Sequence, residues 1–144
     1  GQLGRPLRNP SDVLAQSTGF IPVSTGALAN QAVQQIACGY FHTMALTSKG
    51  QVVVFGRNDY GQLGLGHACS VCFVPTVVEL PHADGDGSVI GAGCYHSLIA
   101  TQNNQLWGFG RNQHGQLFMP PGSNFFTPAL AQLPRGGQIE RIKC

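Results

Sequence analysis

Side chains that could bind a metal ion lie close together at one point of the 144-residue chain. His67, Cys69 and Cys72 form a His-x-Cys-x-x-Cys cluster, and imidazole nitrogen and thiolate sulfur are ligands that zinc prefers. A second pair of ligands at a suitable spacing is missing, because the nearest candidates are His82 and Cys94. We interpret the cluster as neighbouring cysteines of a loop between two strands that hold no metal, with a zinc site as the alternative.

Other patterns that carry chemistry are incomplete. The Gly-Gln-Leu-Gly-Leu-Gly segment at 61–66 misplaces glycine for a dinucleotide-binding loop, and no βαβ pattern surrounds it. Asp84 and Asp86 lie in a Gly-rich connector that lacks the remaining ligands of a calcium loop. A nucleophile elbow and a phosphate-binding lysine loop are also missing. We therefore expect no catalytic residue, no cofactor and no enzyme.

Two histidines recur with a fixed spacing. His42 follows Gly39 and His96 follows Gly93, and the two histidines are 96 − 42 = 54 residues apart. A catalytic or metal-binding histidine has no reason to recur in this way. We expect both histidines to be structural and hydrogen-bonded to neighbouring backbone.

The same spacing governs most of the chain. Phe-Gly-Arg-Asn at 55–58 recurs at 109–112, and Gly-Gln-Leu at 61–63 recurs at 115–117 and appears again at 1–3. Several markers that share one period indicate tandem structural repeats. Further markers at matching phases are Ile36, Ile90, Ile142, Pro22, Pro75 and Pro128.

Each repeat is predicted to form four short strands. The turn at Lys49-Gly50 has its counterpart in Asn103-Asn104, because asparagine tolerates the positive φ of a tight hairpin. Four strands in about fifty residues are typical of a β-propeller blade, so the fold class is all-β with four-stranded antiparallel blades. The strand-length runs of the first complete copy are residues 35–38, 42–47, 51–55 and 75–80.

The residues that recur in both copies are expected to be structural. Glycines allow tight connections between strands, and the asparagines are expected to hold their loop by hydrogen bonds to the backbone. Trp107 and the other blade aromatics are expected in the core. The repeated set is Gly39, His42, Gly56, Asn58, Gly61, Gly93, His96, Gly110, Asn112 and Gly115.

The loop after the third strand is the candidate partner-binding segment. It carries Arg57 and Tyr60 in one copy, and Arg111 and His114 in the next. Because repeats stack around an axis, equivalent loops emerge on one face, and arginine and aromatic side chains are enriched in protein interfaces. We predict that this face binds a protein partner, with solvated arginines as the alternative.

The order of these motifs resembles the repeats of the regulator of chromosome condensation 1 family. Residues 36–46, 49–51 and 55–64 look like one whole repeat, and residues 92–98 and 106–117 look like a second. The resemblance implies a closed propeller of about seven blades.

The chain departs from that pattern at three phenylalanines. Phe55 and Phe109 stand where the family usually has tryptophan, and Phe118 replaces the last glycine of the loop motif. The replacement at Phe118 predicts a locally altered loop in the second copy.

The chain holds two full copies of the middle hairpin and partial copies at both ends. We expect residues 1–144 to form a partial propeller of two to three repeats, a fragment of a longer propeller domain. Such an open array exposes strand edges, through which copies could self-associate.

A non-enzymatic protein-interaction platform is the first functional hypothesis. The resemblance implies an alternative, a guanine-nucleotide exchange factor, or part of one, for a Ran-type small GTPase, although no inserted hairpin that could act as a wedge is evident. A chromatin-associated module is a second alternative. The net charge is only +2 and the basic residues are scattered, so direct nucleic-acid contact is not expected.

Composition favours an intracellular compartment, either nucleus or cytoplasm. No apolar run approaches the roughly 18 residues that cross a bilayer, the first residues form no signal peptide, and no membrane partner is expected. Five cysteines without close pairing fit a reducing environment.

Overall fold

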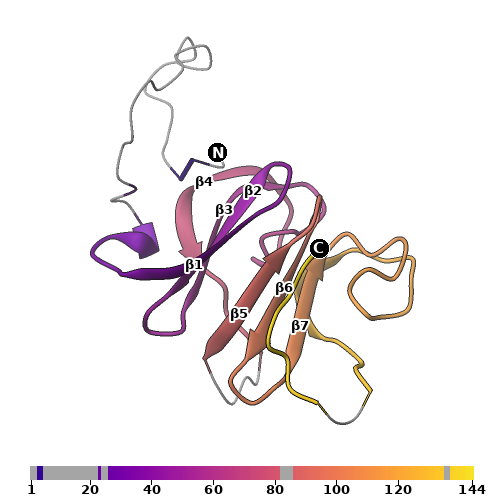
Figure 1. Cartoon of the computed structure of the whole chain (residues 1–144). Coiled ribbons are helices and arrows are strands. Elements are labelled where there is room, and N and C mark those ends of the chain that lie inside the picture. The colour runs from indigo at the N-terminus through magenta and orange to yellow at the C-terminus, as the bar shows by residue number, and fades with distance from the viewer. Residues whose placement is uncertain (1–2, 5–22, 24–25, 82–85, 135–136) are drawn as a thin grey trace.

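Two four-stranded antiparallel sheets stand side by side in the computed structural model (Figure 1). The strand order is β1-β2-β3-β4 in the first sheet and β5-β6-β7-β8 in the second, the meander of a propeller blade. The predicted all-β fold with four-stranded blades is therefore confirmed. The structure describes residues 3–4, 23, 26–81, 86–134 and 137–144. Expectations placed on Gly1, Gln2, Pro22, His82 and Asp84 lie outside these residues.

Each blade occupies one continuous stretch of the chain. The first blade consists of β1 (Val33–Cys38), β2 (His42–Thr47), β3 (Val52–Asn58) and β4 (Cys69–Val77). The second consists of β5 (Gly87–Ala92), β6 (His96–Thr101), β7 (Leu106–Gly110) and β8 (Phe125–Leu130). A short 3-10 helix, η2 (Gly26–Leu28), packs on β4. Within the described ranges, no helix has the length and apolar character needed to cross a membrane.

The hairpin turns have the predicted backbone conformation. Gly50 has a φ of 77° and Asn104 a φ of 61°. In each turn the amide of this residue donates to a threonine carbonyl, Thr47 at 3.0 Å and Thr101 at 2.9 Å. A glycine and an asparagine thus close equivalent turns, because both tolerate the left-handed region.

The outer strand begins earlier than predicted. β4 starts at Cys69 and not at Pro75, so the prediction that Cys69 and Cys72 belong to a loop is wrong. Both residues pair with β3, and Val71, Phe73 and Val74 beside them are residue types that favour strands. Pro75 and Pro128 lie inside β4 and β8, where the pairing shifts register and no regular ladder bond is lost.

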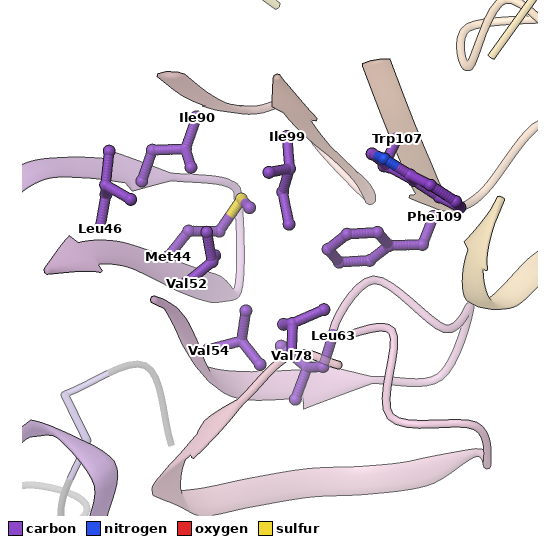
Figure 2. Close-up of a cluster of buried hydrophobic side chains, with 10 residues drawn as sticks. All are labelled: Met44, Leu46, Val52, Val54, Leu63, Val78, Ile90, Ile99, Trp107 and Phe109. Atoms are coloured by element: carbon purple, nitrogen blue, oxygen red, sulfur yellow. The ribbon is translucent and has the colours of Figure 1, made fainter. Parts of the chain in front are cut away.

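The largest buried cluster lies between the two blades (Figure 2). Successive residues of a strand point to opposite faces, so Val52 and Val54 of β3 enter the same cluster as Trp107 and Phe109 of β7. Complete burial of each such side chain stabilises the fold by about 1.5–3 kcal/mol. The other members of this cluster are Met44, Leu46, Leu63, Val78, Ile90 and Ile99.

A glycine of the loop after β3 lies against the aromatic ring of the following blade. A Cβ atom at Gly64 would come within 2.9 Å of the Phe109 ring, and one at Gly4 within 3.1 Å of Phe55. Both glycines have positive φ, 64° and 66°. Phe118 occupies the equivalent position of the second blade and has a φ of 58°. The predicted alteration of the loop is therefore not found at this residue. Phe118 instead adopts the positive φ of the equivalent glycine, which is a strained conformation for a residue with a Cβ atom.

Hydrogen bonds also join the blades at the start of β2. His42 Nε2 lies 2.9 Å from Ser97 Oγ, and the Ser97 hydroxyl donates to the Gln62 carbonyl at 2.8 Å. Because a hydroxyl has one proton, Nε2 must be the donor to Ser97. His42 therefore bonds a side chain of the next blade, and the prediction that it bonds neighbouring backbone is wrong. Burial, with a smaller contribution from His96, lowers the pKa of His42 to about 4. Burial lowers the pKa of His96 as well.

Acid should weaken the fold through His42. Its folded pKa of about 4 lies below the roughly 6.5 of an unfolded histidine, so the fold favours the neutral ring. The corresponding stability is complete above about pH 6.5 and is lost as the pH falls to about 4, by up to about 3 kcal/mol. Urea denaturation at about pH 7 and about pH 4.5 measures this loss.

The variant His42→Phe removes the titrating group and should show a smaller loss of stability between the two pH values. His114→Gln alters an exposed histidine and should retain the full loss. An unchanged pH dependence in His42→Phe would contradict the assignment.

Backbone strain at Phe118 should be relieved by glycine. Phe118→Gly and Phe118→Ala both remove the half-exposed ring, but only alanine retains the Cβ atom that disfavours positive φ. We expect the glycine variant to be the more stable of the two by about 1 kcal/mol, measured by urea denaturation. Equal stabilities of the two variants would show that the residue bears no strain.

Candidate functional site

Aromatic and arginine side chains gather on one face where the two blades meet. They come from the β1–β2 turn, the end of β3 and the loop that follows it, the β5–β6 turn, and the residue after β7. We call this group the aromatic–arginine cluster. Its members are Tyr40, Phe41, Arg57, Tyr60, Tyr95 and Arg111.

Backbone hydrogen bonds place each arginine beside an aromatic turn residue. The Arg57 amide donates to the Phe41 carbonyl at 2.8 Å, and the Arg111 amide donates to the Tyr95 carbonyl at 2.8 Å. The two contacts occupy the same position in successive blades. The repeated hairpin thus delivers an arginine and a ring to the same edge of each blade.

Tyr95 is the centre of the aromatic group. Its ring centroid lies 5.1 Å from that of Tyr60, 5.8 Å from that of Tyr40 and 6.2 Å from that of Phe41. These separations lie in the range in which aromatic pairs attract. Because Tyr95 belongs to the second blade and the other three rings to the first, the cluster spans the junction between blades.

The arginines lie over the rings. The Cζ atom of Arg57 is 5.5 Å from the centroid of Phe41, and that of Arg111 is 5.6 Å from Tyr60 and 6.0 Å from Tyr95. These distances are those of cation–π contacts. Arg111 therefore contacts a ring from each blade.

The two arginines differ in their charge partners. Arg57 forms an ion pair with Asp59. Arg111 instead donates from Nε to Gln113 Oε1 at 2.9 Å, and no carboxylate pairs with it among the residues that the structure describes. A hydrogen bond with the Cys94 side chain raises the pKa of Tyr40.

The cluster is partly open to solvent: Arg57 is exposed, and Tyr60, Tyr95 and Arg111 are half-buried. Tyr40 is 64% exposed and Phe41 is 39% exposed. Exposed aromatic rings beside arginine are the composition of protein-binding surfaces, and burying these rings against a partner would be favourable. The arrangement can therefore recognise another molecule through ring faces and cationic hydrogen bonds.

Three of the four residues expected to bind a partner meet in this cluster. Arg57, Tyr60 and Arg111 belong to it, whereas His114 is exposed and lies outside it. His114 is the counterpart of Tyr60 in the second blade. Tyr60 contacts the turn of the blade that follows it, and no third blade lies beyond His114 among the described residues.

The sequence interpretation missed Tyr40, Phe41 and Tyr95. A usable signal was present, because each repeat carries an aromatic residue directly before its histidine, at Phe41 and Tyr95.

The repeated asparagines hydrogen-bond the backbone of their own loops. Asn58 Oδ1 accepts from the Leu63 amide at 2.8 Å, and Asn112 Oδ1 accepts from the Leu117 amide at 3.0 Å. Their Nδ2 groups donate to the carbonyl oxygens of His67 and Pro120, respectively.

The remaining repeated residues also occupy matching sites in the two blades. The rings of His42 and His96 lie directly against Gly39 and Gly93, where a Cβ atom would collide with them. Equivalent positions with positive φ are occupied by Gly56, Gly61, Gly110 and Gly115.

Cys72 of β4 lines a cavity of about 670 Å³. Burial and the neighbouring Cys69 raise the pKa of the Cys72 thiol to about 12. In the described part of the chain, no three His, Cys, Asp or Glu side chains are grouped to hold a metal ion.

Known proteins are similar to this chain in sequence. The chain is 32% identical over 128 residues to the probable E3 ubiquitin-protein ligase HERC4 of Rattus norvegicus, covering 86% of this chain and 12% of that protein. It is 37% identical over 122 residues to the secretion-regulating guanine nucleotide exchange factor of Bos taurus, covering 83% of this chain and 24% of that protein.

A solved structure shows the same fold. Prp20p of Saccharomyces cerevisiae superposes with a TM-score of 0.78 at 23% identity, over 99% of this chain and 34% of that chain.

These similarities correct one prediction. The chain was expected to be no enzyme, but it matches a protein named as a probable E3 ubiquitin-protein ligase over most of its own length. The chain spans about an eighth of that relative, 12% of its length.

Family models match the repeats directly. One model of the regulator of chromosome condensation (RCC1) repeat matches residues 1–46 and 49–100, and a second matches residues 33–62 and 86–116. With both blades showing the expected topology, the chain belongs to the regulator of chromosome condensation (RCC1) repeat family.

Proposed function

We propose that this chain provides a protein-binding face of an RCC1-type propeller, centred on the aromatic–arginine cluster. The observation that carries the proposal is a group of partly exposed rings and arginines that contact one another across the junction of two blades. Tyrosine and arginine are the residue types that most often dominate binding energy at interfaces.

The cluster is arranged before any partner arrives. Backbone hydrogen bonds fix Arg57 and Arg111, and ring contacts restrict their side chains. Side chains that are already ordered lose less conformational entropy on binding. A partner that covers both turns would therefore gain the contact area of the rings at a reduced entropic cost.

Removing two rings should weaken the interaction. In Tyr40→Ala/Tyr95→Ala, no charge changes, but the centre of the cluster is lost. We expect the affinity for a protein partner to fall by about 30-fold, as for the loss of a strong interface residue. Tagged full-length chain would capture partners for quantitative mass spectrometry, and each purified partner would then be titrated against the variants.

Phe73→Ala is the matched control, because Phe73 is an exposed aromatic residue of β4 outside the cluster. It should bind the same partner as the unsubstituted chain. If a partner still binds Tyr40→Ala/Tyr95→Ala but no longer binds Phe73→Ala, the binding surface lies on β4 and the proposal is refuted.

Guanine-nucleotide exchange is a second candidate function. It is favoured by the 37% identity to the bovine secretion-regulating guanine nucleotide exchange factor, and its partner would be a small GTPase of the Ran type. Release of a fluorescent GDP analogue from such a GTPase, with and without the chain, tests it. If the chain only binds proteins, we expect the intrinsic release rate to be unchanged; accelerated release would establish the exchange function instead.

A further inference from the structure

The two repeats differ by one charge at the cluster. In the first blade Asp59 is the ion-pair partner of Arg57. In the second blade Gln113 holds the same position, two residues after Arg111, and accepts hydrogen bonds from Nε and Nη2 of that arginine. The local geometry is thus repeated, but the neutralising carboxylate is not.

Arg111 therefore keeps an uncompensated positive charge in a fixed orientation. Its guanidinium lies over Tyr60 and Tyr95, and Gln113 Oε1 is its acceptor. A guanidinium has five N–H donors, and the described residues provide no other acceptor for those of Arg111. The rings displace water from part of the group, which strengthens its attraction for an anion.

We infer that Arg111, with Tyr60 and Tyr95, binds a carboxylate side chain in an acidic segment of a partner protein. This inference rests on the proposed protein-binding function. Planar guanidinium and carboxylate groups match in geometry, and Asp59, which lies beside the cluster, is already paired with Arg57. The neighbouring exposed rings of Tyr40 and Phe41 suit apolar residues of the same segment.

A protein carboxylate fits this site better than a nucleic-acid backbone. Binding to nucleic acid draws on many cations that contact successive phosphates. The cluster contains two arginines, of which one is already neutralised, and the whole chain has a net charge of only +2.

The charge difference between the repeats supplies the test. The probe is a short fluorescein-labelled peptide of alternating Asp and Leu residues, and its counterpart has Asn in place of Asp. Fluorescence anisotropy with the full chain should show about ten-fold tighter binding of the acidic peptide. Equal binding of the two peptides would overturn the inference.

Gln113→Asp gives Arg111 the internal carboxylate that Arg57 has. It should weaken binding of the acidic peptide by about ten-fold, whereas the matched neutral variant Gln113→Asn should bind as the unsubstituted chain does. Asp59→Asn frees Arg57 and should strengthen binding. Affinity unaffected by Gln113→Asp would show that Arg111 does not hold the carboxylate.

The same variants separate this inference from the proposed function. If Tyr40→Ala/Tyr95→Ala releases a captured partner but Gln113→Asp does not, the cluster binds protein without the carboxylate contact and the inference fails alone. If neither variant weakens the binding of the partner, the inference and the proposed function both fail. A short oligothymidine is tested as a competitor of the acidic peptide. If it displaces the peptide, and if Gln113→Asp no longer binds the oligothymidine, Arg111 binds a nucleic-acid phosphate and the inference is overturned.

Discussion

Burial of Phe109 against the loop of the preceding blade is the contact on which the other features depend. The ring is fully buried, and Gly64 lies so close to it that a Cβ atom would come within 2.9 Å. This close approach fixes the distance between the blades. It thereby brings Ser97 within hydrogen-bonding distance of His42 and places Tyr95 beside Tyr60. The surface cluster is thus a consequence of interior packing, since a wider junction would separate its rings.

The repeat period made much of the fold predictable, because a strand or turn identified in one copy is checked by the other. β2 was predicted with its observed bounds, and the turns at Gly50 and Asn104 with their positive φ. The start of β4 was not predictable in this way, because residues 69–74 have no matching motif in the second copy and their pairing with β3 is a long-range contact. Phe118 shows the same limit, since neighbouring contacts hold its backbone in a conformation that its own side chain disfavours.

The candidate site was predictable only as far as one loop. Arg57 and Arg111 share a phase of the repeat, and Tyr60 lies in the same loop as Arg57, so periodicity selects this loop. Tyr40 and Tyr95 belong to a different turn, and their proximity to that loop arises only when consecutive blades stack. Repetition also explains how such a surface can be varied, because a single replacement, Asp59 by Gln113, changes the charge of one blade and preserves its backbone.

Trp107 gives the junction an optical consequence. It is the single tryptophan of the chain and is 6% exposed, packed among the side chains that join the blades (Figure 2). Its indole emission therefore reports on the environment of one place, the space between the two sheets. Docked blades should give a blue-shifted spectrum, and water that enters as the blades separate should shift it to the red. The protein thus carries an intrinsic fluorophore that follows the opening of its own blade junction without any label.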